Sequence, residues 1–155
     1  MKDNCLIVIT GASSGIGKAL AIEFARKNNP LLLISRHIAK MKEIRNKDVI
    51  YAQVDVSDYL ALEKTIRKAE EKYGPTCCLI NNAGTACLGS FETTPIDDYS
   101  REIDVLFKGV LNGIKIVLSL MSKQKFRTII NISSIGDRKP ATKAIAYNAS
   151  KHAVR

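Results

Sequence analysis

Short apolar runs alternate with longer helical patterns along this chain, and no other feature constrains its fold as strongly. Five continuous apolar runs have the length of strands: Cys5–Ile9, Leu31–Ile34, Val49–Val54, Cys77–Ile80 and Thr128–Ile132. Such runs are typical of parallel strands whose two faces are both covered by helices. The sequence therefore predicts an α/β fold, a doubly wound parallel sheet with right-handed crossovers.

The segments between these runs repeat apolar residues at helical spacing. The repeats are Ile16, Leu20 and Phe24; Leu62, Ile66, Ala69 and Tyr73; and Ile103, Phe107, Val110, Ile114 and Leu118. Asn28-Asn29-Pro30 ends the first predicted helix, Ser57-Asp58 begins the second, and the third extends from about Asp97 to Met121. The chain has 155 residues, and at about 150 residues per domain we expect one domain over residues 1–155.

Composition excludes several classes of protein. The chain is 46% hydrophobic and 25% charged, an average globular mixture that excludes a disordered or collagen-like chain. It contains no apolar run of about 18 residues, as a membrane helix would need. Its first residues become glycine-rich too soon for a signal peptide. We therefore expect a soluble, cytoplasmic protein with no membrane partner.

The four cysteines are Cys5, Cys77, Cys78 and Cys87, and no two of them form a Cys-x-x-Cys pair. Three lie in or beside apolar runs, so we expect all four to be small buried hydrophobic residues in a reducing compartment. The chain has only two histidines, His37 and His152. The sequence therefore contains no cluster of metal-ligating residues, and we expect no metal site.

A formal charge of +9 raises the hypothesis of a nucleic-acid partner. Basic residues are spread over the polar faces of several predicted helices and over loops, and no stripe with interleaved aromatic residues is formed. The pattern favours a solvated surface or a small anionic ligand over nucleic acid.

A glycine-rich loop joins the first predicted strand to the first helix. Its sequence is Thr10-Gly11-Ala12-Ser13-Ser14-Gly15-Ile16-Gly17. Glycines let a backbone approach a phosphate closely, and a helix N-terminus offers unpaired N–H groups. The G-x-x-x-G-x-G spacing differs from G-x-G-x-x-G, and the loop lacks the Gly-Lys-Ser/Thr ending of a nucleoside-triphosphate site. The alternative is a purely structural turn.

The second predicted strand ends in Ser35-Arg36. A dinucleotide site usually carries Asp or Glu about 20 residues after its glycine loop, where the carboxylate binds the ribose 2′-hydroxyl. With no carboxylate here to repel a 2′-phosphate, the Arg36 guanidinium can pair with one. The sequence therefore predicts NADP(H) rather than NAD(H), and the alternative is that Arg36 is an ordinary surface arginine.

Five motifs occur in an order that resembles the short-chain dehydrogenase/reductase superfamily, over the whole chain. They are Thr10-Gly11-x-x-x-Gly15-Ile16-Gly17, Asp55-Val56, Asn81-Asn82-Ala83-Gly84, Ser134 and Tyr147-x-x-x-Lys151. The resemblance implies a Rossmann-like fold, in which Gly11, Ser13, Ser14, Gly15, Ile16 and Gly17 hold the cofactor. It implies that Asp55 and Val56 contact adenine, and that Asn82, Ala83 and Gly84 pass under the adenosine ribose. The alternative for these segments is a strand-ending turn, because asparagine and glycine readily form turns.

The resemblance also implies a catalytic trio, Ser134, Tyr147 and Lys151. Tyr147 and Lys151 are four residues apart, so on a helix they share a face. A neighbouring ammonium and the positive ring of the oxidised nicotinamide favour the phenolate, so Tyr147 would transfer the proton. Lys151 would also hold the nicotinamide ribose, and Ser134 would position the substrate oxygen. We prefer Ser134 to Ser133, which could act only from the other side of the strand.

Two features depart from the family pattern. Leu106 occupies the place of an asparagine that helps a lysine–water proton relay, and Asn112 lies on another face of that helix. Family members also continue beyond the equivalent of Arg155, through further strands and a substrate-covering loop. The resemblance thus implies that this chain lacks the C-terminal strands, most of the substrate pocket and much of a subunit interface.

The resulting hypothesis is an NADP(H)-dependent oxidoreductase that interconverts a carbonyl and a secondary alcohol of a small molecule. The alternative is a cofactor-binding remnant without turnover, which acts as a binding or regulatory module. Leu106 and the missing C-terminal part favour the remnant, whereas the intact catalytic trio opposes it. The family also implies homo-oligomers formed through the long helix and the Tyr147 helix.

Overall fold

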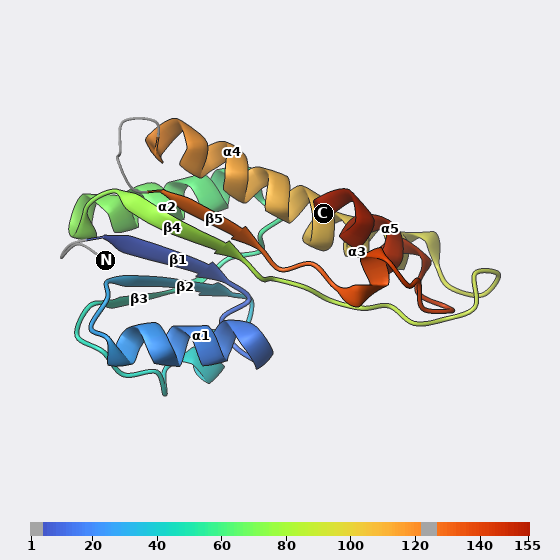
Figure 1. Cartoon of the computed structure of the whole chain (residues 1–155), viewed down its shortest axis with the longest axis horizontal. Coiled ribbons are helices and arrows are strands. Elements are labelled where there is room, and N and C mark those ends of the chain that lie inside the picture. The colour runs from blue at the N-terminus through green and yellow to red at the C-terminus, as the bar shows by residue number, and fades with distance from the viewer. Residues whose placement is uncertain (1–4, 122–126) are drawn as a thin grey trace.

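A parallel sheet of five strands forms the middle layer of the computed structural model, which describes residues 5–121 and 127–155 (Figure 1). The strands are β1 (Leu6–Thr10), β2 (Leu31–Ser35), β3 (Val49–Gln53), β4 (Thr76–Asn81) and β5 (Thr128–Asn131). Their order across the sheet is β3-β2-β1-β4-β5, and every neighbouring pair is parallel. The direction of winding reverses between β1 and β4, so the predicted doubly wound α/β fold is confirmed. A ligand crevice is expected at the carboxyl ends of these two strands.

Helices cover both faces of the sheet (Figure 1). The helices are α1 (Gly15–Arg26), α2 (Tyr59–Tyr73), α3 (Ile96–Ile103), α4 (Gly109–Met121) and α5 (Ile145–Val154). In Figure 1, α1 lies on one face, α2 and α4 lie on the other, and α3 and α5 lie beyond the carboxyl ends of the strands. No helix of the described residues is long and apolar enough to span a bilayer.

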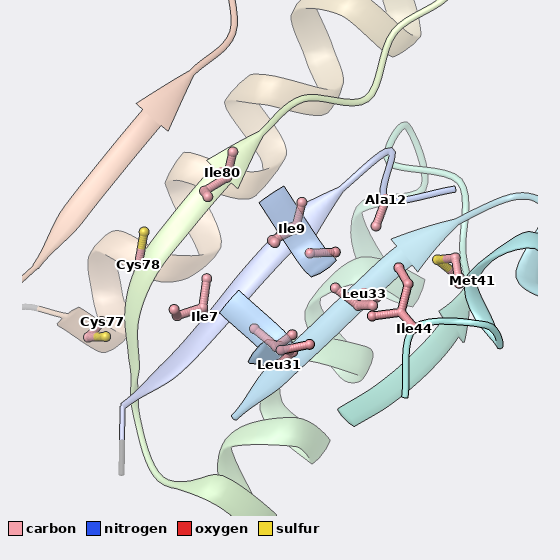
Figure 2. Packing of buried hydrophobic residues seen from close by; sticks show 12 residues of the cluster. Ile7, Ile9, Ala12, Leu31, Leu33, Met41, Ile44, Cys77, Cys78 and Ile80 are labelled. Atoms are coloured by element: carbon pink, nitrogen blue, oxygen red, sulfur yellow. The ribbon is translucent and has the colours of Figure 1, made fainter. Parts of the chain in front are cut away.

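Alternate side chains of the central strands fill two separate cores. Ile7 and Ile9 of β1 pack with Leu31 and Leu33 of β2 on the α1 side, where Met41 and Ile44 also lie (Figure 2). On the opposite face, the core contains Leu6, Val8, Leu32, Ile34, Leu62, Ile66, Ile116 and Val117. A strand turns successive side chains to opposite faces, so a continuous apolar run supplies both cores. Burial of each large aliphatic side chain stabilises the fold by about 1.5–3 kcal/mol.

The two edge strands are less buried than their apolar sequences predict. All five residues of β1 and of β2 are buried, but those of β3 are half-buried or exposed, and Ile130 of β5 is 40% exposed. The expectation that all five runs are buried on both faces is therefore wrong at the edges. An edge strand has a neighbouring strand on one side only, so solvent reaches its outer side.

The predicted long helix is interrupted. A π-helical turn, Asp104–Lys108, separates α3 from α4. The wider turn rotates the helix, so the apolar residues on its two sides no longer form one face. Ile103 and Leu118 are exposed, whereas Leu106 and Val117 are completely buried. The prediction of one continuous buried apolar face is therefore wrong at its two ends, Ile103 and Leu118.

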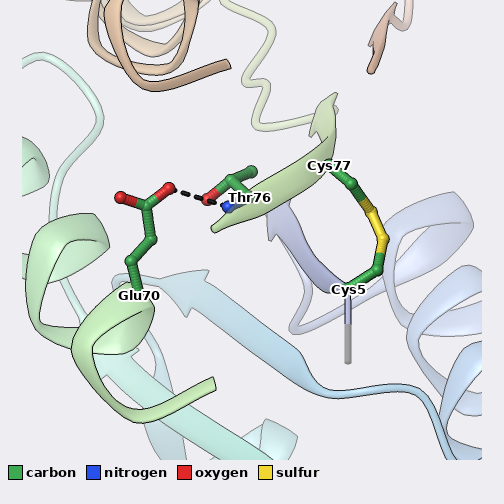
Figure 3. The surroundings of a disulfide bond; sticks show 4 residues. All are labelled: Cys5, Glu70, Thr76 and Cys77. Carbon is green, nitrogen blue, oxygen red and sulfur yellow. Dashed lines mark hydrogen bonds between the residues drawn. A yellow bond between two sulfur atoms is a disulfide. The ribbon is translucent and has the colours of Figure 1, made fainter. Parts of the chain in front are cut away.

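A disulfide joins Cys5 and Cys77 beside the amino-terminal ends of β1 and β4 (Figure 3). The two strands are neighbours, and their pairing brings the Cα atoms of the two cysteines to 5.6 Å. Cys78 is a buried free thiol, and Cys87 is a half-buried one. The expectation of four reduced cysteines is therefore wrong for two of them, and the cysteine-based argument for a reducing compartment no longer holds.

Candidate functional site

A cavity of about 560 Å³ lies at the carboxyl ends of the strands. It is lined by the glycine loop, by the segments that follow β2, β3 and β4, and by Tyr147 and Lys151 of α5. Of the residues that the sequence singles out, the structure places these at the cavity: Gly11, Ser13, Ser14, Gly15, Ile16, Ser35, Arg36, Asp55, Val56, Asn82, Ala83, Gly84, Tyr147 and Lys151. Gly17 and Ser134 are the two that lie outside this lining. The parallel topology thus brings segments from both halves of the chain to one hollow.

Gly17 lies outside the cavity lining and lets the loop pack closely against Gly11 and Asn82. A Cβ added there would overlap the Asn82 side-chain amide and lie 2.5 Å from the Gly11 carbonyl oxygen. The Asn82 amide donates to the carbonyls of Thr10 and Gly11 at 3.1 and 3.2 Å. Gly15 has a φ of +52° and has no atom within 4 Å of its would-be Cβ. The loop is therefore tight on its protein side and open on its cavity side, as a close backbone approach to a ligand requires.

The N-terminus of α1 faces this open side. Its N-cap is Ser14, whose side chain makes no capping hydrogen bond. The first N–H groups of a helix have no partner within the helix. Together with the helix dipole, they form a site that favours an anion such as a phosphate group.

Thr10 supports the loop and was not among the residues that the sequence analysis selected as site residues. Its Oγ1 accepts hydrogen bonds from the backbone N–H groups of Asn82 and Ala83, both at 3.0 Å. Thr10 is only 2% exposed and lies at the end of an otherwise apolar strand. A buried hydroxyl at the end of an apolar strand is the signal that could have identified it.

The residues that follow β2 form a polar end of the cavity. The Ser35 hydroxyl donates to Ser13 Oγ at 2.8 Å, and the backbone N–H of His37 donates to Ser35 Oγ at 3.2 Å. Arg36 is exposed and also borders a second hollow of about 440 Å³, together with Arg101. Two hydroxyls and a guanidinium therefore surround this end, with no carboxylate at either position 35 or 36.

Asp55 brings a carboxylate to the next part of the cavity wall. It accepts hydrogen bonds from the backbone N–H and the hydroxyl of Ser57, at 3.0 and 2.7 Å. Burial alone would raise the pKa of Asp55, but these hydrogen bonds and the charges of Arg36 and Arg101 outweigh it and lower the pKa. Asp55 is therefore ionised at neutral pH. Asn112 holds the same segment, because its amide donates to the Val56 carbonyl at 3.0 Å.

Tyr147 and Lys151 share one face of α5, as their spacing predicts. The Lys151 ammonium lies 5.8 Å from the centroid of the Tyr147 ring and donates to the Ile132 carbonyl at 2.7 Å. Lys151 is 6% exposed, and this burial lowers its pKa. Leu106 is completely buried and lines the same cavity. An apolar side chain therefore lies where the family resemblance implies a polar one.

The two adjacent serines have different surroundings. Ser134 caps the short helical turn Ile135–Asp137, where its Oγ accepts from the Gly136 N–H at 3.1 Å. A Cβ added at Gly136 would lie 3.5 Å from both Ser134 Oγ and Tyr147 Cε1, so these two side chains face one small space. Ser133 lines the cavity itself, and its hydroxyl lies 3.2 Å from the Lys151 carbonyl oxygen. The role of Ser134 stays a prediction.

No group of three or more His, Cys, Asp or Glu side chains that could hold a metal ion occurs within residues 5–121 and 127–155. The polar groups of the cavity are instead amides, hydroxyls and single charges. Such groups suit an organic ligand that carries phosphates.

Comparisons with known proteins agree with this arrangement. The family model described as short chain dehydrogenase matches residues 5–155. An uncharacterized oxidoreductase of Listeria monocytogenes is 37% identical over 98% of the chain, and a 3-ketodihydrosphingosine reductase of Mus musculus is 32% identical over 96%. The ligand-free structure of an aldohexose dehydrogenase from Thermoplasma acidophilum is similar over 97% of the chain, with a TM-score of 0.87 and 29% identity.

The chain spans 64% of the Listeria relative, 48% of the mouse relative and 57% of the Thermoplasma structure. The match nevertheless covers the sheet, the glycine loop and the helix that carries Tyr147 and Lys151. This chain therefore belongs to the short chain dehydrogenase family.

Proposed function

We propose that this chain is the NADP(H)-binding and proton-transferring part of an oxidoreductase that interconverts a carbonyl and a secondary alcohol. One observation carries the proposal: a single cavity is lined both by the glycine loop and Arg36, which follow β1 and β2, and by Tyr147 and Lys151. Lys151 donates to the Ile132 carbonyl just after β5, and β4 and β1 lie between β5 and β2 in the sheet, so the two groups lie toward opposite ends of the cavity. A nicotinamide dinucleotide has its groups in the same order, with phosphates and adenosine at one end and the reactive ring at the other. The names of a ketone reductase and a sugar dehydrogenase among the similar proteins agree with both directions of this reaction.

The residues present fit such a cofactor. The uncapped N-terminus of α1 and the open side of Gly15 would hold the pyrophosphate. Ser13, Ser35 and Arg36 would hold a 2′-phosphate, since hydroxyls donate to phosphate oxygens and a guanidinium pairs with them. The ionised Asp55 would accept from the amino group of adenine, because a carboxylate is an acceptor only.

The other end of the cavity would perform the acid–base chemistry. Hydride exchange is the chemistry that a bound nicotinamide supplies. Tyr147 would donate a proton to the substrate oxygen in reduction and accept it in oxidation. The Lys151 ammonium, 5.8 Å from the Tyr147 ring centroid, would stabilise the phenolate. Ser134 would hydrogen-bond the substrate oxygen and hold it for the transfer.

Leu106 supports a second candidate function, a module that binds the cofactor without turnover. Its buried aliphatic side chain cannot hydrogen-bond the water of a proton relay. Resupply of the Tyr147 proton would then be slow. The two candidates share the binding site and differ in whether a bound reduced cofactor is consumed.

Titration with NADPH and with NADH, followed by cofactor fluorescence, tests the binding site. We expect NADPH to bind more tightly than NADH, and Arg36→Glu to weaken NADPH by about 10- to 100-fold while leaving NADH nearly unchanged. Arg45→Glu is the matched control, because Arg45 is exposed and lies outside the cavity lining. Equal binding of both cofactors, or equal losses in the two variants, would contradict the 2′-phosphate assignment.

Single-turnover measurements then separate the two candidates. Bound NADPH is mixed with a panel of ketones and aldehydes, and its absorbance is followed in the wild type and in Tyr147→Phe. Consumption in the wild type that Tyr147→Phe loses supports the oxidoreductase. Tight binding with no consumption across the panel supports the binding module.

We also propose that copies of the chain associate through α4 and α5. Leu111 and Leu118 of α4 and Ile145 of α5 are each about half exposed. Light scattering coupled to size exclusion tests this, and a monomer at every concentration would exclude it.

A further inference from the structure

Glu102 is a buried carboxyl group that the proposed chemistry does not use. It lies in α3 and is only 1% exposed. Burial raises its pKa above the usual range. Its Oε1 accepts a hydrogen bond from the backbone N–H of Cys87 at 2.9 Å, whereas its Oε2 is buried without a hydrogen-bond partner among the described residues. Burial of a carboxyl group costs free energy unless hydrogen-bond donors compensate for it, so this one is expected to face such donors.

The carboxyl group also faces the start of α5. The backbone N–H groups of Cys87 and Tyr147 both oppose the rise in its pKa. Of these two groups, the Cys87 N–H makes a hydrogen bond of ordinary geometry to the carboxyl, and the Tyr147 N–H lies near it. Tyr147 is the third residue of α5, because the helix begins at Ile145. The N–H of this third position has no partner within the helix and is usually satisfied by the side chain of the N-cap residue.

The N-cap of α5 cannot provide that acceptor. It is Ala144, which makes no side-chain hydrogen bond. A carboxylate near a helix N-terminus is favoured by the helix dipole as well as by the N–H groups. Glu102 is therefore placed to cap α5 from a different helix, through its unpartnered Oε2, at the residue that the proposed reaction uses.

The same carboxyl group holds a second wall of the cavity. Asn82, Ala83, Gly84, Thr85 and Ala86 line the cavity after β4. Cys87 is the next residue, and its N–H is the one that donates to Glu102. One buried side chain thus connects α3 to the segment after β4 and lies near the start of α5. In Figure 1, α3 and α5 lie together at this end of the molecule.

We propose that Glu102 is a positioning residue that fixes Tyr147 against the segment after β4, by giving the N-terminus of α5 the acceptor that Ala144 lacks. The hydrogen bond from the Cys87 N–H is observed in the structure, and the one from the Tyr147 N–H to the unpartnered Oε2 is the part that is proposed. Its consequence for catalysis rests on the proposed function of Tyr147. A displacement of about 1 Å at a reacting group can cost about 100-fold in rate.

Two variants distinguish the effect of losing the hydrogen-bond acceptor from the effect of changing the volume of the side chain. Glu102→Gln keeps an acceptor oxygen at nearly the same length, whereas Glu102→Leu keeps a similar volume without an acceptor. The first measurement is amide hydrogen exchange at Tyr147 and Cys87, which needs neither cofactor nor activity. We expect exchange at both amides to be about tenfold faster or more in Glu102→Leu, since a lost hydrogen bond of about 1.4 kcal/mol corresponds to that factor. Glu102→Gln should stay within about threefold of the wild type.

The second measurement is the kinetics of carbonyl reduction with NADPH. Glu102→Leu should lower kcat by about 10- to 100-fold, whereas the Kd for NADPH should change by less than about threefold. Glu102→Gln should recover most of kcat. If Glu102 only stabilised the fold, Glu102→Leu would not lower kcat while leaving the Kd for NADPH unchanged. Glu102→Gln would then not restore kcat either.

The outcomes are distinct from those that test the proposed function. Wild-type exchange at both amides in Glu102→Leu would overturn the anchoring, whatever the activity. Faster exchange with an unchanged kcat would overturn the effect on the reaction. If the wild-type chain reduces no carbonyl, the proposed function fails while the exchange data still decide the anchoring. If Glu102→Leu does not fold, Glu102→Asp replaces it, because it withdraws the carboxyl by one methylene and should speed exchange at both amides beyond that of Glu102→Gln.

Discussion

The hydroxyl of Thr10 supports the cofactor loop, and its removal should destabilise the fold by an amount that the structure sets. Thr10→Val replaces the hydroxyl by a methyl group of similar size. Two backbone N–H groups, those of Asn82 and Ala83, then lose their acceptor. The hydrogen bond that Thr10 Oγ1 donates to the Ile80 carbonyl, at 3.4 Å, is also lost.

The magnitude follows from these two N–H groups. Each buried N–H without a partner costs about 1–3 kcal/mol, and the 3.4 Å bond adds little. Asn82 and Ala83 are half-buried, so water recovers part of the loss. We therefore expect the free energy of unfolding to fall by about 2–4 kcal/mol. At about 2–4 °C per kcal/mol for a chain of this size, Tm should fall by about 10 °C.

Urea denaturation followed by circular dichroism measures this loss. Thr10→Ser is the matched control, because it keeps the hydroxyl and removes only a methyl group, at about 1 kcal/mol. A Thr10→Val protein that is as stable as Thr10→Ser or more stable would contradict this prediction, because the loss of the hydroxyl would then cost no more than the loss of a methyl group.

Three further perturbations have defined outcomes. Asp58 caps α2 by accepting from the Ala61 N–H at 3.0 Å, and Asp58→Ala should lower the free energy of unfolding by about 1 kcal/mol in the same urea assay. Because the pKa of Asp55 is lowered on folding, its contribution to stability is present above about pH 4 and is lost as the pH falls through the folded-state pKa. Asp55→Asn should therefore flatten the acid limb of a plot of unfolding free energy against pH, and an unchanged limb would contradict this. Thiol titration of the unfolded, unreduced chain should find two thiols rather than four, because Cys5 and Cys77 are joined, and four would exclude the disulfide.

Local patterns predicted the framework of the fold. The run Leu31–Ile34 corresponds to β2 (Leu31–Ser35), and Ser57-Asp58 precedes α2 at Tyr59. Apolar runs, caps and chain-breaking residues act within a few residues of sequence, so they can be recognised without the partner elements. The interrupted helix around Leu106 could not be recognised in this way. Its π-helical turn and the burial of its faces depend on which elements pack against it.

The chemical groups of the candidate site can be recognised from short spacings along the chain: a glycine loop that follows β1, Arg36 after β2, and Tyr147 and Lys151 one helical turn apart. These features depend on short spacings that the backbone converts directly into geometry. The contacts that hold these groups in place are visible only in the folded chain. The partners of Thr10 lie 72 and 73 residues away, Cys5 and Cys77 are 72 residues apart, and the carboxyl of Glu102 accepts from the Cys87 N–H in the segment after β4. Such contacts form because the parallel crossovers bring distant segments to one end of the sheet, and no local pattern in the sequence encodes that meeting.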